Sequence, residues 1–285
     1  MKKVIIAGKD SYIGSNLKRW LEQTKKDYAV EEVGTREDIW KTKDFSDYDV
    51  VVHVAGIAHV SSDPKLESLY YAVNRDLALD VAKKAKQEGV KQFIFMSSMT
   101  IYGKDSTIGK EKLIDKDTIP KATDFYGQSK LEADRELQKL QDENFRVVII
   151  RTPMVYGPEC KGNFPRLKKI AKRTPIFPDI ENKRSMIYIE NLCEFMKQCI
   201  DNLYSGIYYP QNKEYLSTKE IIKVMSESMN RKIWFTKIFN PFLKLLSKKI
   251  NIINKVFGSK IYKKELSGDF SYCVVDTIES IRRSI

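Results

Sequence analysis

The sequence predicts an α/β fold, with a doubly wound parallel sheet and a small C-terminal lobe. Three observations lead to this prediction. Short apolar runs alternate with helix-periodic segments through the first half of the chain. The run at 49–56 is nearly all apolar, as expected for a parallel strand that is covered on both faces. After Arg151, proline-containing loops separate short elements. In such folds, ligands bind at the carboxyl ends of the strands.

The individual elements follow from these patterns. Strands are predicted at residues 3–7, 28–33, 49–56, 92–98 and 146–151. Apolar residues at helical spacing predict helices over residues 13–23, 66–88 and 127–143. The change after Arg151 predicts a main domain at residues 1–160 and a lobe at residues 161–285 that does not fold independently.

The composition excludes several classes of protein. The chain has 285 residues, of which 42% are hydrophobic and 31% charged, as in an ordinary globular enzyme. No apolar run reaches the ~20 residues of a membrane span, and the start is too short for a signal peptide, so a cytoplasmic protein is expected. The cysteines lack metal-ligand spacing and are expected to be free thiols. With two histidines, His53 and His59, we expect no metal site.

The net charge of +12 is concentrated near the C-terminus. Residues 231–264 contain no acidic residue and these basic ones: Arg231, Lys232, Lys237, Lys244, Lys248, Lys249, Lys255, Lys260, Lys263 and Lys264. A weak association with an anionic membrane surface is one interpretation. The favoured interpretation is that the apolar residues of this stretch close the lobe while the lysines are solvated. No nucleic-acid-binding module is recognisable, so no nucleic-acid partner is expected.

The loop "AGKDSYIG" between the first strand and the first helix indicates a phosphate site. Gly8, Ser11 and Gly14 stand where a dinucleotide-binding loop has three glycines. Free amides and the helix dipole favour a pyrophosphate here, beside Tyr12 and Ile13. Ser11 departs from the pattern, although its hydroxyl can donate to phosphate. An ordinary strand-to-helix turn is the alternative; otherwise the main domain is a Rossmann-type dinucleotide-binding domain.

The end of the second strand bears on the choice of nucleotide. An acidic residue there binds the ribose of NAD, whereas an arginine suits the extra phosphate of NADP. The strand runs into Thr35 and Arg36, so NADP(H) is favoured over NAD(H). A shift of register would instead make Glu31 or Glu32 the ribose ligand.

Tyr126 and Lys130, in "FYGQSK", form a candidate proton-transfer pair. The same spacing recurs at Tyr209/Lys213 and Tyr215/Lys219, so spacing alone means little. Tyr126 is expected to open a helix, which puts Lys130 one turn further on the same face.

Six ordered segments together resemble the extended short-chain dehydrogenase/reductase family, the nucleotide-sugar epimerases, dehydratases and reductases. The segments are "DVVVHVAG", "AVNRDLALDVAKKA", "FIFMSSMTIYG", "YGQSK", "RTPMVYGP" and "RSMIYIENL". The resemblance implies catalytic residues Ser98, Tyr126 and Lys130. It places Ala55, Gly56, Asn74 and Pro153 beside the cofactor, and Arg184 on the diphosphate of a UDP-sugar. A homodimer is also expected.

The chemistry explains these residue types. A tyrosine has a pKa near ~10, and a neighbouring ammonium favours its phenolate. Lys130 is expected to do this and to hold the nicotinamide ribose, while Ser98 binds the substrate oxygen. A non-catalytic regulator on the same fold commonly lacks the tyrosine or the lysine.

The residues after Ser98 narrow the reaction. Family dehydratases carry an aspartate–glutamate pair where this chain has Met99 and Thr100, so dehydration is not expected. The runs "VKQFIFMSSMTIYGK", "GNFPRL" (162–167) and "NKRSMIYI" resemble bacterial cell-surface polysaccharide 4-ketoreductases. This resemblance implies NADPH-dependent reduction of a UDP-4-keto-6-deoxy-N-acetylhexosamine. The alternative is an NAD-dependent UDP-sugar 4-epimerase. Asn163 would contact the substrate or, alternatively, cap a helix.

Overall fold

The structure is a computed structural model that describes residues 1–24, 28–36, 38–58 and 63–285. His59 lies outside the described residues. The chain divides into two compact units, each described here by itself. Unit 1 comprises residues 1–103, 119–152 and 192–210, and unit 2 comprises residues 104–118, 153–191 and 211–285. Both units are therefore assembled from separate stretches of chain.

Unit 1 is built on a parallel sheet, six-stranded among the described residues. Its strands are β1 (Lys2–Ala7), β2 (Tyr28–Val33), β3 (Val50–His53), β4 (Gln92–Ser98), β6 (Arg146–Thr152) and β10 (Gly206–Tyr208). They lie in the order β10-β6-β4-β3-β1-β2. The order reverses direction between β1 and β3, where parallel sheets of this kind bind ligands. The predicted α/β class and parallel sheet are thus confirmed.

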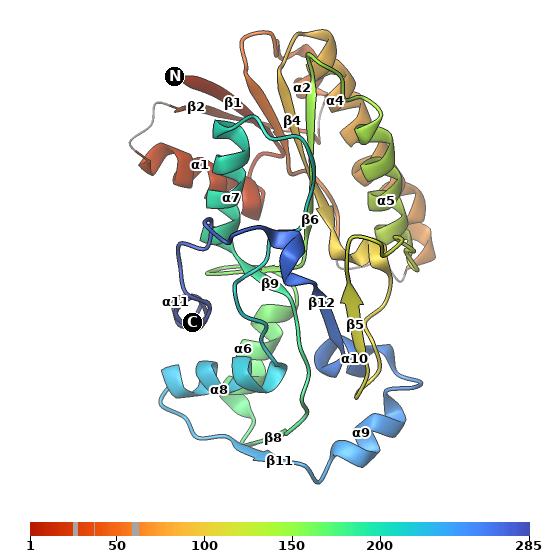
Figure 1. The fold of residues 1–285 in the computed structure, drawn as a ribbon, viewed down its shortest axis with the longest axis vertical. Coiled ribbons are helices and arrows are strands. Elements are labelled where there is room, and N and C mark those ends of the chain that lie inside the picture. The colour runs from red at the N-terminus through yellow and green to blue at the C-terminus, as the bar shows by residue number, and fades with distance from the viewer. Residues whose placement is uncertain (25–27, 37, 59–62) are drawn as a thin grey trace. The chain divides into compact units, whose positions relative to one another are not determined.

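Helices cover both faces of this sheet (Figure 1). On one face lie α4 (Leu77–Gln87) and α5 (Phe125–Gln138); on the other lie α1 (Tyr12–Gln23) and α7 (Ile189–Asp201). Trp20 of α1 donates to Glu194 of α7 at 3.0 Å, which joins the two helices of the second face. Unit 1 also contains η1 (Pro64–Leu66), α3 (Glu67–Tyr71), η2 (Ala72–Asp76), η3 (Met99–Tyr102) and α2 (Ile39–Thr42).

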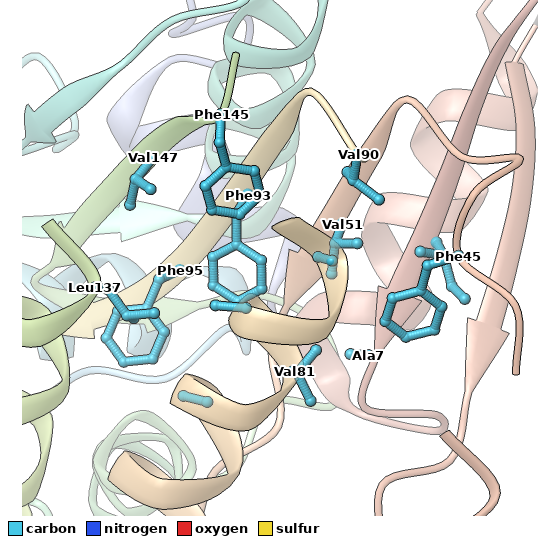
Figure 2. Packing of buried hydrophobic residues seen from close by; sticks show 14 of the residues in the cluster. Ala7, Phe45, Val51, Val81, Val90, Phe93, Phe95, Leu137, Phe145 and Val147 are labelled. Carbon is cyan, nitrogen blue, oxygen red and sulfur yellow. The ribbon is translucent and has the colours of Figure 1, made fainter. Parts of the chain in front are cut away.

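A large hydrophobic cluster of unit 1 lies between the sheet and the helices α4 and α5 (Figure 2). Phe93 and Phe95 of β4 project from the sheet toward the helix residues Val81 and Leu137, and all four side chains are inaccessible to solvent. Complete burial of such side chains contributes about 1.5–3 kcal/mol each. This packing holds α5 against β4, and the candidate catalytic residues belong to these two elements.

Unit 2 consists of short strand pairs and helices. The parallel pairs are β5 (Glu111–Ile114) with β12 (Ser259–Tyr262), β7 (Met154–Tyr156) with β9 (Met186–Tyr188), and β8 (Ile176–Pro178) with β11 (Trp234–Thr236). The helices are α6 (Asn163–Arg173), α8 (Thr218–Ser228), α9 (Asn240–Leu246), α10 (Asn251–Phe257), α11 (Thr277–Arg283) and η4 (Lys264–Ser267).

Two details differ from the sequence expectation. The helix predicted over 66–88 is divided by a π-helical segment, η2, which contains Asn74. A sixth strand, β10, joins the sheet beside β6, although its three residues are too short to give a sequence signal. Among the residues that the structure describes, no helix has both the length and the apolar character needed to cross a bilayer.

Candidate active site

Helix α5 presents Tyr126 and Lys130 in its first turns. Asp124 caps the helix, and its Oδ1 accepts the backbone N–H of Gly127 at 2.8 Å. Such a cap fixes where the helix begins. The ring of Tyr70 packs edge-on against Tyr126, with 6.1 Å between ring centroids. Tyr126 thus lies in the first turn of α5, as predicted, although the helix spans Phe125–Gln138 rather than the predicted range 127–143.

Ser98 ends β4 and lies against Tyr126. Its hydroxyl oxygen accepts from the backbone N–H of Thr100 at 3.2 Å and from the Thr100 hydroxyl at 2.9 Å. Ser98 also forms a hydrogen bond with the Tyr126 hydroxyl, and this bond lowers the pKa of the tyrosine. The side chain at position 100 therefore orients Ser98 and offers no carboxyl group for acid–base chemistry.

Lys130 is buried and 5% exposed. Its Nζ donates to the carbonyl of Met96 at 2.9 Å and lies 4.6 Å from the centroid of the Phe95 ring. Burial lowers the pKa of Lys130 from 10.5 to about 8. The amine therefore titrates close to neutral pH, with its position fixed by β4.

The pKa of Tyr126 is raised, first by burial, while its hydrogen bond with Ser98 lowers it and Asp124 raises it further. Lys130 is not among the groups that shift this pKa. The expectation that the Lys130 ammonium favours the Tyr126 phenolate therefore stays a prediction. In this state of the protein Tyr126 is a proton donor at neutral pH.

The glycine loop is built as a close approach of three backbone segments. Gly8 has a φ of +130°, and a Cβ there would lie 2.7 Å from the backbone nitrogen of Ala55. At Gly14 a Cβ would lie 2.6 Å from the Ser11 hydroxyl and 3.0 Å from Ile6. Both positions thus require glycine. Tyr12 and Ile13 begin α1 directly behind the loop.

Ser11, which replaces the middle glycine, caps α1. Its Oγ accepts the backbone N–H of Gly14 at 3.1 Å. A hydroxyl that accepts one hydrogen bond still has its own proton to donate. Its predicted contact with a phosphate therefore remains compatible with the cap.

Strand β2 ends at Val33, the register on which the preference for NADP(H) depends. Glu31 pairs with Lys43 at 2.7 Å and accepts from Tyr48, so its carboxylate is already engaged. Thr35 follows the strand and Arg36 is exposed. These residues fit the predicted contact with a nucleotide phosphate, which stays a prediction.

Asn74, Gly56 and Lys130 lie together. The fully buried Asn74 accepts from the N–H of Ile57 at 2.9 Å and donates to the Ile57 carbonyl at 3.1 Å. It also donates to Ser129 of α5 at 3.3 Å. A Cβ at Gly56 would lie 3.0 Å from Asn74 Oδ1 and 3.3 Å from Lys130 Nζ. The π-helical turn thus places Asn74 where it holds the loop after β3, as π-bulges at functional sites commonly do.

The other predicted residues belong to unit 2. Pro153 is buried directly after β6. Asn163 is the exposed first residue of α6, whose N-cap is Gly162, so Asn163 does not cap that helix. Arg184 donates to Asp105 at 3.2 Å and to the Gly258 carbonyl at 3.2 Å. The predicted roles of these residues at a cofactor or substrate stay predictions.

A buried network behind the candidate site was not identified from the sequence. Arg151 of β6 forms a two-pronged ion pair with Asp134 of α5, at 2.9 Å for both contacts. Ser97, the neighbour of Ser98, donates to the same carboxylate at 2.8 Å. The Arg151 guanidinium also donates to Tyr102 and to Tyr209. The network ties α5 to the two strands beside it; an aspartate one turn beyond Lys130 was its only sequence signal.

Asp105 is a second residue that the sequence did not reveal. Its carboxylate contacts both Arg184 and Lys260 Nζ, the latter at 3.9 Å. The Lys260 side chain is 6% exposed, and those of Arg184 and Asp105 are 14% and 16% exposed. Two largely buried cations thus share one carboxylate.

Comparison with known proteins assigns the family. Residues 4–209 match the model of the NAD dependent epimerase/dehydratase family. A UDP-glucose 4-epimerase of Vibrio cholerae is 31% identical over 90% of this chain and 86% of its own length. N-acetyl-alpha-D-glucosaminyl-diphospho-ditrans,octacis-undecaprenol 4-epimerase of Escherichia coli O157:H7 is 26% identical over 90% of this chain and 81% of its own length.

Solved structures share the fold across the whole chain. The UDP-glucuronic acid 4-epimerase of Bacillus cereus in complex with NAD is 19% identical, with a TM-score of 0.74 over 99% of this chain and 95% of that one. RMD from Pseudomonas aeruginosa, complexed with NADPH, is 17% identical, with a TM-score of 0.75 over 99% of this chain and 98% of that one. The predicted resemblance is thereby confirmed: the chain belongs to the NAD dependent epimerase/dehydratase family, whose enzymes use a nicotinamide dinucleotide.

Proposed function

We propose that this protein is a 4-epimerase of a hexose carried on a diphosphate, with a UDP-sugar as the first substrate to test. The observation that carries the proposal is the contact of Ser98 with Tyr126, in a site whose adjoining residue is Thr100 rather than an acid. Such a site supports proton transfer to and from a sugar oxygen but lacks the carboxylates that eliminate water. The Vibrio and Escherichia relatives described above, which each span 90% of this chain, are both named as 4-epimerases.

The mechanism follows from the positions of three side chains. A nicotinamide dinucleotide held at the glycine loop of Gly8 and Gly14 would supply hydride transfer at carbon 4 of the sugar. In the phenolate form that the Lys130 ammonium is predicted to favour, Tyr126 takes the proton of the carbon 4 hydroxyl and later gives it back, while Ser98 donates a hydrogen bond to the same oxygen. Lys130 lies one helical turn from Tyr126 and supplies positive charge beside the reacting groups when protonated.

A diphosphate is the part of the substrate that the two named relatives have in common. The Vibrio protein is named for a uridine diphosphate sugar, and the Escherichia protein for a sugar on undecaprenyl diphosphate. Arg184 offers a planar guanidinium suited to two phosphate oxygens. We therefore assign Arg184 to the diphosphate, and both carriers are to be tested.

The second candidate is the NADPH-dependent 4-ketoreductase of a UDP-4-keto-6-deoxy-N-acetylhexosamine. The specific observation in its favour is the exposed Arg36 after β2, which suits the additional phosphate of NADP. A reductase oxidises NADPH in proportion to the keto sugar, whereas an epimerase needs no net reductant.

The substitution Tyr126→Phe tests either reaction. It removes the only proposed proton donor at the reacting oxygen, and we expect kcat to fall at least about 10²-fold. Activity is measured with UDP-glucose and UDP-GlcNAc plus NAD, and with the 4-keto sugar plus NADPH. The matched control is Tyr71→Phe, which removes a hydroxyl that donates to Gln128 at 3.2 Å. This variant should retain activity. Full activity of Tyr126→Phe would contradict the assignment.

A further inference from the structure

Unit 2 carries an unusual concentration of exposed apolar side chains between residues 234 and 252. They are Trp234 (77% exposed), Ile238 (81%), Phe239 (44%), Phe242 (62%), Leu245 (64%), Ile250 (40%) and Ile252 (61%). Large apolar side chains gathered on one surface mark an interaction site, whereas single ones do not. Other apolar residues of the stretch 231–264, Phe257, Ile261 and Tyr262, are buried, so this stretch closes the lobe with some of its apolar residues and exposes the others.

The segment that carries these side chains is folded, and hydrogen bonds of buried or half-buried polar groups anchor its backbone. Helix α9 has no buried residue, whereas Ser247 and Asn254 on either side of the α9–α10 connection are 1% and 8% exposed. Asn254 donates to the Ser247 carbonyl at 2.8 Å, and Asn240 at the start of α9 donates to the Asp179 carbonyl at 2.7 Å. These bonds hold the backbone in place while apolar side chains face solvent. The exposure is therefore a feature of a folded segment.

The apolar residues follow one helical face and continue onto a strand pair. Phe242 and Leu245, three residues apart, share one face of α9, and Ile238 lies in the turn before this helix. Trp234 of β11 is aligned with Ile176 of β8, which is itself 47% exposed. Figure 1 shows α9 following β11 along the chain, at the edge of this part of the structure.

Basic residues surround these apolar side chains. The exposed ones are Arg231, Lys232, Lys237, Lys244, Lys248, Lys249 and Lys255. Within the described ranges, none of them forms an ion pair with a carboxylate. We call this set, together with the seven apolar residues, the apolar-basic surface. A partner that binds this surface therefore needs both negative charge, to complement the lysines and the arginine, and an apolar region, to cover the apolar side chains.

We propose that the apolar-basic surface binds the interface of an anionic lipid bilayer. Aromatic and aliphatic side chains insert at the boundary between headgroups and acyl chains, while lysines remain with the anionic headgroups. A second copy of the chain fits less well. A symmetric dimer would place the same seven cations of both copies face to face, without carboxylates between them. The proposal is independent of the sugar that the enzyme uses.

The fluorescence emission of Trp234 reports directly on binding to vesicles. The protein is mixed with vesicles of equal parts phosphatidylglycerol and phosphatidylethanolamine, and with vesicles of phosphatidylcholine alone. With the anionic vesicles we expect sedimentation of the protein and a blue shift of tryptophan emission. With phosphatidylcholine we expect neither. Trp234→Phe should still sediment but lose the shift, because the other tryptophans, Trp20 and Trp40, lie outside the apolar-basic surface.

Matched variants distinguish binding through this surface from nonspecific adsorption of the protein to vesicles. Ile238→Ser should weaken vesicle binding, whereas Ile119→Ser should not, although both side chains are 81% exposed. Lys248→Gln with Lys249→Gln should weaken vesicle binding about thirtyfold. Lys116→Gln with Lys121→Gln, which changes the net charge equally, should leave it unchanged.

Three results would overturn the proposal: no sedimentation with anionic vesicles at physiological salt, equal binding to both vesicle types, or equal effects of the matched variants. Light scattering without lipid tests whether a second copy of the chain binds to this surface instead. A dimer that Ile238→Ser converts to a monomer, with no vesicle binding, would assign the surface to a second copy. No substrate is present in these measurements, so failure here would leave the proposed epimerase reaction intact.

Discussion

Lys130 illustrates how the candidate site departs from what stability alone would favour. A lysine at 5% exposure, with a pKa lowered to about 8, is held in a place that disfavours its charge. Between pH 10.5 and 8 the unfolded chain binds a proton at this position that the folded chain releases. The folded state therefore loses stability as the pH falls through this window. At neutral pH the loss is about 3 kcal/mol.

Lys130→Met should accordingly change stability in a pH-dependent way. The variant lacks the ionisation, so its free energy of unfolding should improve relative to wild type as the pH falls from about 10 to about 7. The lost hydrogen bond to Met96 subtracts about 1 kcal/mol at every pH. Urea unfolding at both pH values gives the difference. If the stability of the variant relative to wild type decreased toward neutral pH, the lowered pKa of Lys130 would be contradicted. The variant should be inactive at every pH.

Asp105 is predicted to compete with the diphosphate. Its carboxylate pairs with Arg184 and lies near Lys260. It therefore occupies the position beside these cations that a phosphate group would take. Asp105→Asn should tighten binding of UDP about fivefold, because a unit charge at such a distance contributes about 1 kcal/mol even in a watery setting. Titration calorimetry with UDP provides the measurement.

Glu111→Gln is the matched control for this change. It makes the same alteration of charge in unit 2, but its carboxylate pairs with Lys183 at 3.3 Å. UDP affinity should be unchanged in this variant. Equal effects of the two variants would point to net charge rather than to competition at Arg184.

At the scale of elements, the position of α5 against β4 and β6 decides whether the reacting groups meet. Core packing through Phe93, Phe95 and Leu137 fixes the distance between helix and sheet. The Arg151–Asp134 ion pair fixes where along the sheet the helix lies. Ser97 and Ser98 lie at the end of β4 beside that pair, so the register of α5 is transmitted to the candidate site.

Asp134→Asn tests this anchoring. It leaves the Arg151 guanidinium, 6% exposed, without its carboxylate, and such a change costs about 3–5 kcal/mol. The free energy of unfolding in urea should fall by this amount. Glu136→Gln, on the same helix, breaks the more exposed pair with Lys139 and should cost less than about 1 kcal/mol. Similar costs for both would show that burial of the pair is unimportant.

At the scale of the whole molecule, the sequence predicted what periodicity and glycine geometry encode. Gly8 and Gly14, where a Cβ would clash, are positions that a spacing rule can find. The strands predicted for unit 1 were apolar enough to be recognised, but the three-residue β10 was not. The parallel sheet and the start of α5 could therefore be predicted from the order of the residues alone.

The remaining features depend on contacts between residues far apart in the sequence. Asp134 with Arg151, and Asp105 with Arg184 and Lys260, carry no local signal because pairing requires the fold. The exposure of Phe242 and Leu245 likewise depends on which face of α9 the backbone bonds turn outward. Periodicity could identify that amphipathic stretch but not whether its apolar side is covered.

We propose that Tyr126 and Ser98 serve a reaction in which the hydride removed from carbon 4 returns to the same carbon. The most direct measurement uses UDP-glucose and UDP-GlcNAc with deuterium at carbon 4 of the sugar, NAD, and proton NMR of the product. We expect the carbon 4 epimer with its deuterium retained and no net reduction of the cofactor. Hydrogen from solvent at carbon 4, or no epimer while NADPH is consumed with the 4-keto sugar, would contradict it.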